Sequence, residues 1–307
     1  HHEAWSARVI RHHPEIHDCL ESHASGTAEA VANLLEHGRS PHPLIKHLVS
    51  SQLDCDRLDY LLRDSYSTGT RYGQLDLDRI LGALTLAPDG DMAIHPKGLM
   101  AVEHYLVVRN LMYRSVYNHR LNVVCNWLLE KLILTARQLG PDQVWADEVM
   151  ATWLWQPDQI RLEDFLANDD QRTGYHLQRW QAEAPAALAE LSGRFLDRRL
   201  LKATAVEHLS PADQLQLLAT ARRLADRHGH DPELCCGLRH QQLRGYHPYR
   251  GGLRLWDGQQ LQALEKASPL VASLATPAAT SWLIHPRDIS NELRQEMDVE
   301  WPRAAAA

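Results

Sequence analysis

Residues 50–69, SSQLDCDRLDYLLRDSYSTG, combine acidic, basic and phenolic side chains with leucines spaced for a helix. At about 100° per residue, an arc of about 100° holds four polar side chains: Asp56, Arg57, Tyr60 and Asp64. A carboxylate can hold a metal cation, and a guanidinium can take phosphate oxygens through a forked contact. The arc therefore predicts a site for a metal–phosphate ligand. A solvated charged face is the alternative, but it gives Tyr60 in the middle of the arc no role.

The helix that carries this arc is expected to begin at Ser51, because Ser51 and Asp54 have the spacing of a capping box. Its opposite side carries the residues expected in the core: Cys55, Leu58 and Leu62, with Leu61 beside them. The sequence therefore predicts a helix with one face in the core and one chemically active face.

A second polar stripe follows in residues 109–120, RNLMYRSVYNHR. The same projection aligns Arg109, Tyr113, Tyr117 and Arg120, with His119 just beside them. Such a stripe can cradle a chain of phosphates. The alternative is a half-buried aromatic seam whose arginines extend to solvent.

Helical periodicity dominates the chain, so we predict a mainly α fold. Helices are expected over 3–11, 27–37, 43–66, 76–84, 98–138, 143–153, 174–192, 194–202 and 210–228. Short strands near 252–258 and 280–285 are expected to pair, with a helix over 258–266 between them and a last helix over 287–298. We expect one domain over residues 1–142 and a helical C-terminal region over 143–307.

Composition excludes several classes of protein. The 307 residues have a formal net charge of −7, and no run of Lys and Arg indicates a nucleic-acid or membrane surface. No segment is long and apolar enough for a transmembrane helix. The five cysteines are odd in number and lack paired metal-type spacing, which indicates reduced thiols and a cytoplasmic protein.

The motifs resemble those of a known family. LVSSQLDCDRLDYLLRDSYSTGTRYGQLDLDRIL, residues 48–81, resembles the third signature of HD-domain phosphohydrolases, within the deoxynucleoside triphosphate triphosphohydrolase-like branch that includes the SAM-and-HD-domain dNTPases. RNLMYRSVYNHR is similar to the phosphate-contacting helix of that branch, and HHEAWSARVI is similar to the segment after its HDIGHGPFSH motif. The resemblance covers most of the chain and implies an HD-domain helical core, with a helical C-terminal region that carries a small β element.

The resemblance implies a role for each matching residue. Asp56 would be the last ligand of a divalent metal, which could be Fe, Mn, Mg or Ni, and His2 would be a catalytic residue that transfers a proton near the scissile phosphate. Residues that would contact the phosphates or sugar of a nucleotide are Arg57, Tyr60, Asp64, Arg109, Tyr117, His119 and Arg120. The implied reaction is metal-assisted attack of water on the α-phosphorus of a deoxynucleoside triphosphate or related nucleotide, which releases triphosphate or phosphate. Relatives are commonly dimers or higher homo-oligomers.

The chain departs from the family pattern at its start. The first metal-binding His and the His-Asp doublet belong before His2, where the chain has no residues for them. We therefore expect an N-terminally truncated fragment that lacks the metal ligands for turnover, with a purification-tag remnant as the alternative for the first residues. The His17-Asp18 doublet lies in the wrong context, and we interpret it as a surface pair.

Three functions stay open on the sequence. The first is the metal-dependent phosphohydrolase that the resemblance implies. The second is a non-catalytic, nucleotide-binding or regulatory HD-like module. The third is a helical interaction protein without a ligand, in which both polar stripes are structural.

Overall fold

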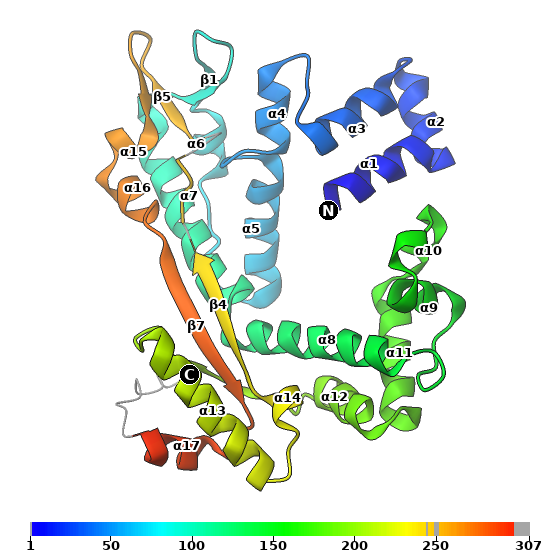
Figure 1. The fold of residues 1–307 in the computed structure, drawn as a ribbon. Helices are drawn as coiled ribbons and strands as arrows, with labels where there is room; N and C mark the ends of the chain where they lie inside the picture. Colours follow the sequence, from blue (N-terminus) through cyan, green and yellow to red (C-terminus); the bar gives the residue numbers. More distant parts are fainter. Residues whose placement is uncertain (1, 244, 249–251, 298–307) are drawn as a thin grey trace. The chain divides into compact units, whose positions relative to one another are not determined.

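The computed structural model describes residues 2–243, 245–248 and 252–297, and its fold is mainly α (Figure 1). The chain forms two compact units, each described by itself. The first comprises His1–Tyr117 and Leu243–Ala278, and the second comprises Asn118–Gln242 and Ala279–Ala307.

This division does not coincide with the boundary expected at residues 142 and 143. Residues 118–142 belong to the second unit because α8 (Arg120–Leu139) buries Val124, Trp127 and Leu132 in that unit's core. A C-terminal segment then returns to the first unit, which periodicity along the chain does not reveal.

Helices of the first unit precede and follow its strands along the sequence. They are α1 (His2–His12), α2 (Pro14–His23), α3 (Thr27–His37), α4 (Pro43–Val49), α5 (Cys55–Thr68), α6 (Leu77–Leu81), the short η1 (Pro96–Gly98), α7 (Leu99–Met112), the π-helical turn η2 (Tyr113–Tyr117), α15 (Leu264–Ala267) and α16 (Pro269–Leu274). Figure 1 shows α5 and α7 side by side, and the two helices are in contact.

A four-stranded sheet completes the first unit, in the order β1 (Leu84–Leu86), β2 (Met92–Ile94), β5 (Arg254–Trp256), β6 (Leu261–Ala263). Its two hairpins are antiparallel, and β2 pairs with β5 in parallel through Ile94 and Leu255. That parallel pair joins the returning segment to the N-terminal part of the unit. The core beneath contains Leu61, Tyr105 and Leu106 of α5 and α7.

The second unit is also helical. Its elements are α8, α9 (Glu148–Trp155), η3 (Pro157–Gln159), α10 (Leu162–Ala167), α11 (Asp170–Glu183), α12 (Ala186–Leu196), β3 (Lys202–Ala205), α13 (Pro211–Arg227), α14 (Pro232–Cys235), β4 (Gly237–Leu243), β7 (Ala278–His285) and α17 (Ser290–Met297). Leu243 and Ala278, at the ends of β4 and β7, belong to the first unit. Side-chain caps begin several helices, including Asp147 at α9, Asp169 at α11 and Ser210 at α13.

The three strands of the second sheet have the order β3-β7-β4, with β3 antiparallel to β7. The strands predicted near 252–258 and 280–285 therefore exist, but they lie in different sheets and do not pair with each other. Between them, β6 and α15 occupy the range expected to be one helix, and α17 lies within the last predicted helix. A prediction from local pattern gives strands but not their partners.

The long helix predicted over 98–138 is interrupted. α7 ends at Met112, η2 follows, and α8 begins at Arg120 with His119 as its N-cap. Apolar periodicity continues through this region, so the sequence pattern does not reveal the interruption. Among the described residues, no helix combines the length and apolarity needed to cross a membrane.

Candidate functional site

The start of α5 is organised by Asp54, whose side chain is 2% exposed. Its Oδ1 accepts a 2.8 Å hydrogen bond from the Arg57 backbone, and its Oδ2 accepts one of 3.1 Å from the Ser51 backbone. The helix therefore begins at Cys55 with Asp54 as the N-cap, and not at Ser51 as predicted. Ser51 instead accepts from the Leu53 backbone in the preceding turn.

Arg57 turns back from α5 onto the same carboxylate. Its guanidinium forms an ion pair with Asp54 and donates to the Ser51 carbonyl at 2.7 Å. Its Nε is buried and has no hydrogen-bond partner among the residues that the structure describes. Burial lowers the pKa of Arg57, but the Asp54 carboxylate and the nearby tyrosines together outweigh burial, so the pKa is raised overall and the charge is held.

Arg109 of α7 is a buried cation, 5% exposed. It donates to the Gln52 side-chain oxygen at 2.9 Å, and its guanidinium lies 5.6 Å from the centre of the Tyr113 ring. In the described part of the chain, no carboxylate forms an ion pair with it. Burying a charge without a counter-charge costs folding free energy. The hydrogen bond to Gln52 and the Tyr113 ring stabilise this cation in part, but no described carboxylate neutralises it.

Three tyrosines connect α5 to the end of α7. The hydroxyls of Tyr60 and Tyr113 are 3.3 Å apart, and Tyr117 donates to Asp64 Oδ2 at 2.8 Å. The Tyr117 ring meets those of Tyr60 and Tyr113 edge to face, at centroid distances of 5.7 and 5.2 Å. We call Arg57, Tyr60, Arg109, Tyr113 and Tyr117 the tyrosine–arginine cluster.

Burial keeps the phenols of Tyr60 and Tyr117 protonated. Burial raises the pKa of Tyr60, and the hydrogen bond with Tyr113 raises it further, while the positive charges of Arg57 and Arg109 oppose both. Burial also raises the pKa of Tyr117, as do its hydrogen bond to Asp64 and the charge of that carboxylate. These two phenols therefore keep their O–H groups near neutral pH, beside two cations.

The two predicted stripes thus meet, although the helix that carries the second differs from the prediction. Tyr113 and Tyr117 lie at the two ends of η2. A π-helical turn advances each residue by a smaller angle than an α-helix, so the projection used for the sequence does not apply there. The turn positions Tyr113 next to Tyr60 and Tyr117 next to Asp64.

Asp56, the predicted metal ligand, lies on the exposed side of α5. Among the described residues, no group of three or more His, Cys, Asp or Glu side chains could hold a metal ion. One carboxylate does not make a site for a catalytic transition metal, so the residues present do not fit that group by themselves.

Three further predicted residues are not brought into the cluster by any described contact. The His2 side chain is 88% exposed, and its Nε2 lies 3.3 Å from Glu3 Oε1. His119 and Arg120 belong to the second unit, where His119 Nδ1 accepts from the Leu121 backbone at 3.3 Å and caps α8. The His17-Asp18 pair lies on the surface, as predicted.

The sequence analysis did not identify Gln52 and Tyr105, which support the cluster, and it gave Asp54 a different role. Gln52 accepts from Arg109 through its side chain and from the buried Tyr105 hydroxyl, at 2.7 Å, through its backbone carbonyl. Asp54 was assigned to a capping box, although its position three residues before Arg57 is also that of an N-cap. Tyr105 lies one turn before Arg109, a spacing that could have indicated a shared face.

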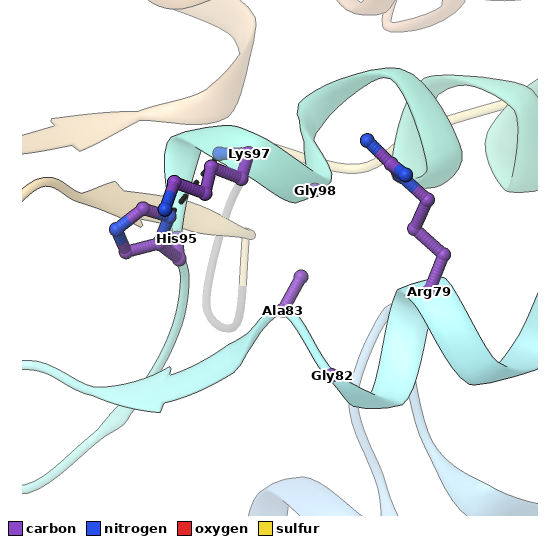
Figure 2. Close-up of a pocket in the computed structure, with 6 residues that line it drawn as sticks. All are labelled: Arg79, Gly82, Ala83, His95, Lys97 and Gly98. Atoms are coloured by element: carbon purple, nitrogen blue, oxygen red, sulfur yellow. Dashed lines mark hydrogen bonds between the residues drawn. The ribbon is translucent and has the colours of Figure 1, made fainter.

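A separate cavity of about 450 Å³ opens in the first unit (Figure 2). It is lined by Arg79, Gly82, Ala83, His95, Lys97 and Gly98. Figure 2 shows His95 beside Lys97, whose backbone nitrogen donates to His95 Nδ1 at 3.2 Å, with Arg79 on the other side of Ala83. None of the residues predicted to bind substrate or metal lines this cavity.

Comparisons with known proteins give a relative that matches most of the chain and another that matches a shorter stretch. The uncharacterized protein YwfO of Bacillus subtilis is 28% identical over 298 residues, which is 94% of this chain and 68% of that protein. The uncharacterized protein MJ1154 of Methanocaldococcus jannaschii is 40% identical over 90 residues, 28% of this chain and 20% of that protein.

Solved structures share the fold. A phosphohydrolase from Bacteroides thetaiotaomicron has a TM-score of 0.76 at 22% identity, covering 92% of this chain and 71% of its own. A hypothetical protein from Aquifex aeolicus has a TM-score of 0.67 at 20% identity, covering 94% of this chain and 70% of its own. At these identities the likeness concerns the fold alone.

A family model described as "HD associated region" matches residues 75–285. The matched range contains α7, η2 and most of the second unit, and it leaves out α5. Since this range is more than half of the chain, the protein belongs to the family of HD-associated regions.

Proposed function

We propose that the chain carries the nucleotide-binding side of an HD-type phosphohydrolase that acts on deoxynucleoside triphosphates or related nucleotides. The tyrosine–arginine cluster would bind the phosphates, and Asp64 with Tyr117 would meet the sugar. The coarser part of this proposal, a phosphohydrolase-like fold, is supported by the solved neighbour from Bacteroides thetaiotaomicron.

The observation that carries the proposal is the buried Arg109. Arg109 is 5% exposed, and its one described side-chain hydrogen bond goes to the neutral amide of Gln52. A buried cation without a carboxylate partner is stabilised when an anion enters beside it. A phosphate group is the anion that best matches the planar fork of a guanidinium.

Arg57 and the tyrosines would orient that anion. Asp54 and the Ser51 carbonyl hold the Arg57 guanidinium in place, and its Nε has no described acceptor. Tyr60 stays protonated, so its hydroxyl can donate to a phosphate oxygen. The Tyr117 hydroxyl donates to Asp64, so towards a sugar hydroxyl it can only accept. The contacts within the protein that hold Arg57, Tyr60 and Tyr117 are present before a ligand binds, which lowers the entropic cost of binding.

Metal chemistry does not follow from the described residues, since Asp56 has no companion donors among them. In the proposed function, a divalent metal at Asp56 would need further ligands besides this carboxylate. His2 as a catalytic residue, the homo-oligomeric state and the cytoplasmic location also remain predictions.

A second candidate is a nucleotide-binding module without catalysis, and the lack of a three-donor metal group among the described residues favours it. One experiment separates the two functions. The chain is incubated with a panel of deoxynucleoside triphosphates and with Mg²⁺, Mn²⁺, Fe²⁺ or Ni²⁺, and both thermal stabilisation and phosphate or triphosphate release are measured.

Stabilisation together with release that Asp56→Asn abolishes supports the phosphohydrolase. Stabilisation without release under any metal supports the binding module. Absence of stabilisation by every nucleotide contradicts both and favours a structural role for the two stripes.

A further inference from the structure

A second cationic cavity, of about 420 Å³, lies wholly within the second unit. The last turn of α12 and three loops form it: the loop after α12, the one between α13 and α14, and the one between β7 and α17. The residues that carry the argument are Arg194, Arg198, Arg199, His230, Arg287 and Asp288. None of them takes part in the proposed nucleotide site.

Asp288, the carboxylate that lines this cavity, is already engaged. Its Oδ2 accepts a 2.7 Å hydrogen bond from His230 Nε2, and its Oδ1 accepts one of 3.1 Å from the Ile289 backbone. Burial raises the pKa of Asp288, but the hydrogen bonds that the carboxylate accepts from His230 and from the backbone together outweigh burial, and the pKa is lowered overall. The carboxylate is therefore ionised and held at the wall, with its oxygens occupied.

His230 links this carboxylate to the first arginine. A guanidinium can only donate, so His230 Nδ1 accepts from Arg194 at 3.3 Å while Nε2–H donates to Asp288. The ring therefore bridges Arg194 and Asp288. It fixes Arg194, which also forms a 2.8 Å ion pair with Glu190.

Two other arginines keep donors that have no partner among the described residues. Arg287 donates through Nε to the Leu200 carbonyl at 2.9 Å, and within the described ranges no acceptor meets its two terminal nitrogens. The side chain of Arg198 has no hydrogen bond or ion pair with any described residue. Its backbone has a φ of 53°, a left-handed conformation that is uncommon for a residue with a side chain.

Arg199 packs against Gly193, which has no side chain to occupy the space. A Cβ on Gly193 would lie 2.8 Å from the Arg199 guanidinium, so glycine leaves room for this cation against α12. Arg199 forms longer ion pairs with Glu190, at 3.5 Å, and with Asp197, at 3.6 Å. It is therefore only weakly neutralised.

The charge of Arg287, which lines the cavity, also acts on Lys202, which does not line it. On the adjoining strand β3, burial is the first cause that lowers the pKa of Lys202. The charges of Arg294, Arg287 and Arg120 lower that pKa further. These cations therefore repel a further positive charge, and an anion would relieve the repulsion.

We propose that this cavity binds a phosphate group, either free inorganic phosphate or the phosphate of a small monoester. Arg198 and Arg287 supply the unused guanidinium donors, while the Arg194–His230–Asp288 chain forms a fixed wall. Forked donors match phosphate oxygens, and the cavity is larger than one phosphate, which leaves space for the group that a monoester carries.

The test follows the imidazole C–H NMR resonances of His230, assigned by His230→Gln, during titration with inorganic phosphate, phenyl phosphate and acetate. We expect the two phosphates to shift these resonances with saturation and acetate to leave them in place. Arg198→Gln and Arg287→Gln should each weaken the apparent affinity about tenfold. Tighter binding of phenyl phosphate would identify a monoester as the ligand, and tighter binding of inorganic phosphate would identify the free anion.

Arg137→Gln is the matched control, because it removes an exposed arginine of the same unit whose described hydrogen bond goes to the Trp153 carbonyl. Resonances that do not move with either phosphate, or affinities that fall equally in Arg137→Gln and Arg198→Gln, would overturn the proposal. The His230 signals report this cavity and not the tyrosine–arginine cluster, so the result is independent of the proposed nucleotide site.

Discussion

Tyr117 and Asp64, 53 residues apart in the sequence, are joined by a hydrogen bond of 2.8 Å from the phenol to the carboxylate. The bond ties the last residue of η2 to the middle of α5. It also holds both groups where the proposed function requires a contact to the sugar of a nucleotide. The same contact therefore serves the fold and the proposed site.

Tyr117→Phe removes this hydrogen bond and keeps the ring contacts with Tyr60 and Tyr113. We expect a loss of about 1 kcal/mol in the free energy of unfolding, measured with urea, because Asp64 loses a partly buried donor. Tyr66→Phe is the control, since Tyr66 lies on the same helix and is 91% exposed. Equal stability of the two variants would show that the bond contributes nothing to the fold.

Gly73 closes tightly on the last turns of α5. A Cβ there would lie 2.3 Å from the Ser65 Cβ and 2.4 Å from the Leu61 carbonyl oxygen. Gly73→Ala should therefore lower the free energy of unfolding by about 3 kcal/mol, because backbone must move. Thermal or urea unfolding measures the loss.

Gly69 is the matched control for this substitution. Its φ is +70°, but a Cβ there meets no atom within 4 Å, so Gly69→Ala has only the left-handed backbone to oppose it and should cost about 1 kcal/mol. A larger loss for Gly69→Ala than for Gly73→Ala would contradict the packing described here.

Local sequence pattern predicted the polar face of α5 well, and it predicted poorly what supports that face. The spacing of Asp56, Arg57, Tyr60 and Asp64 is a property of one helix and can be read from the chain. The partner of Arg57 is Asp54, whose role depends on where the helix begins, and helix starts vary by a few residues in any reading of pattern. Cys55 was expected in the core and is exposed, because α5 buries Leu58, Leu61 and Ser65 instead.

Features that depend on residues far apart in the sequence could not be predicted from the sequence pattern. Gln52 has no periodic signal, yet it accepts from both Arg109 and Tyr105. The turn η2 inserts a change of helical pitch that apolar spacing does not record. The cationic cavity of the second unit draws on three loops far apart in the sequence, so its arginines appear unrelated until the chain is folded.

His285 makes the stability of the second unit depend on pH. It is 1% exposed, and its two ring nitrogens contact the Pro286 carbonyl at 2.7 Å and the Thr204 hydroxyl at 3.0 Å. Burial lowers the pKa of His285 to about 4, with Lys202 and Arg294 lowering it further and the Pro286 hydrogen bond opposing them. The neutral ring is therefore the form that fits the fold.

An unfolded histidine has a pKa of about 6.5, so the unfolded chain takes up the proton first as the pH falls. The stabilising contribution is present above pH 6.5 and is lost between about 6.5 and 4, by about 3 kcal/mol in all. His285→Gln should flatten this part of the pH profile of the free energy of unfolding, and the exposed His23→Gln should not. A profile that His285→Gln leaves unchanged would contradict the assignment.

Asp54→Ala removes both the cap of α5 and the partner of Arg57. We expect a loss of about 3 kcal/mol in the free energy of unfolding, because a half-buried cation is left without its counter-charge. Asp59→Ala removes an exposed carboxylate that pairs with Arg63 on the same helix, and it should change stability by less than about 0.5 kcal/mol. Urea unfolding compares the two variants, and similar losses would refute the role given to Asp54.

We propose that the buried Arg109, which has no carboxylate partner among the described residues, binds a phosphate of a nucleotide. Isothermal titration calorimetry of deoxynucleoside triphosphates against the wild type, Arg109→Met and Arg63→Met tests it most directly, with urea unfolding of each variant to confirm that it is folded. Arg63 is 61% exposed and lies on α5. We predict that Arg109→Met weakens binding at least tenfold and that Arg63→Met changes it less than twofold. Equal affinities of all three proteins, or no binding to the wild type, would contradict the claim.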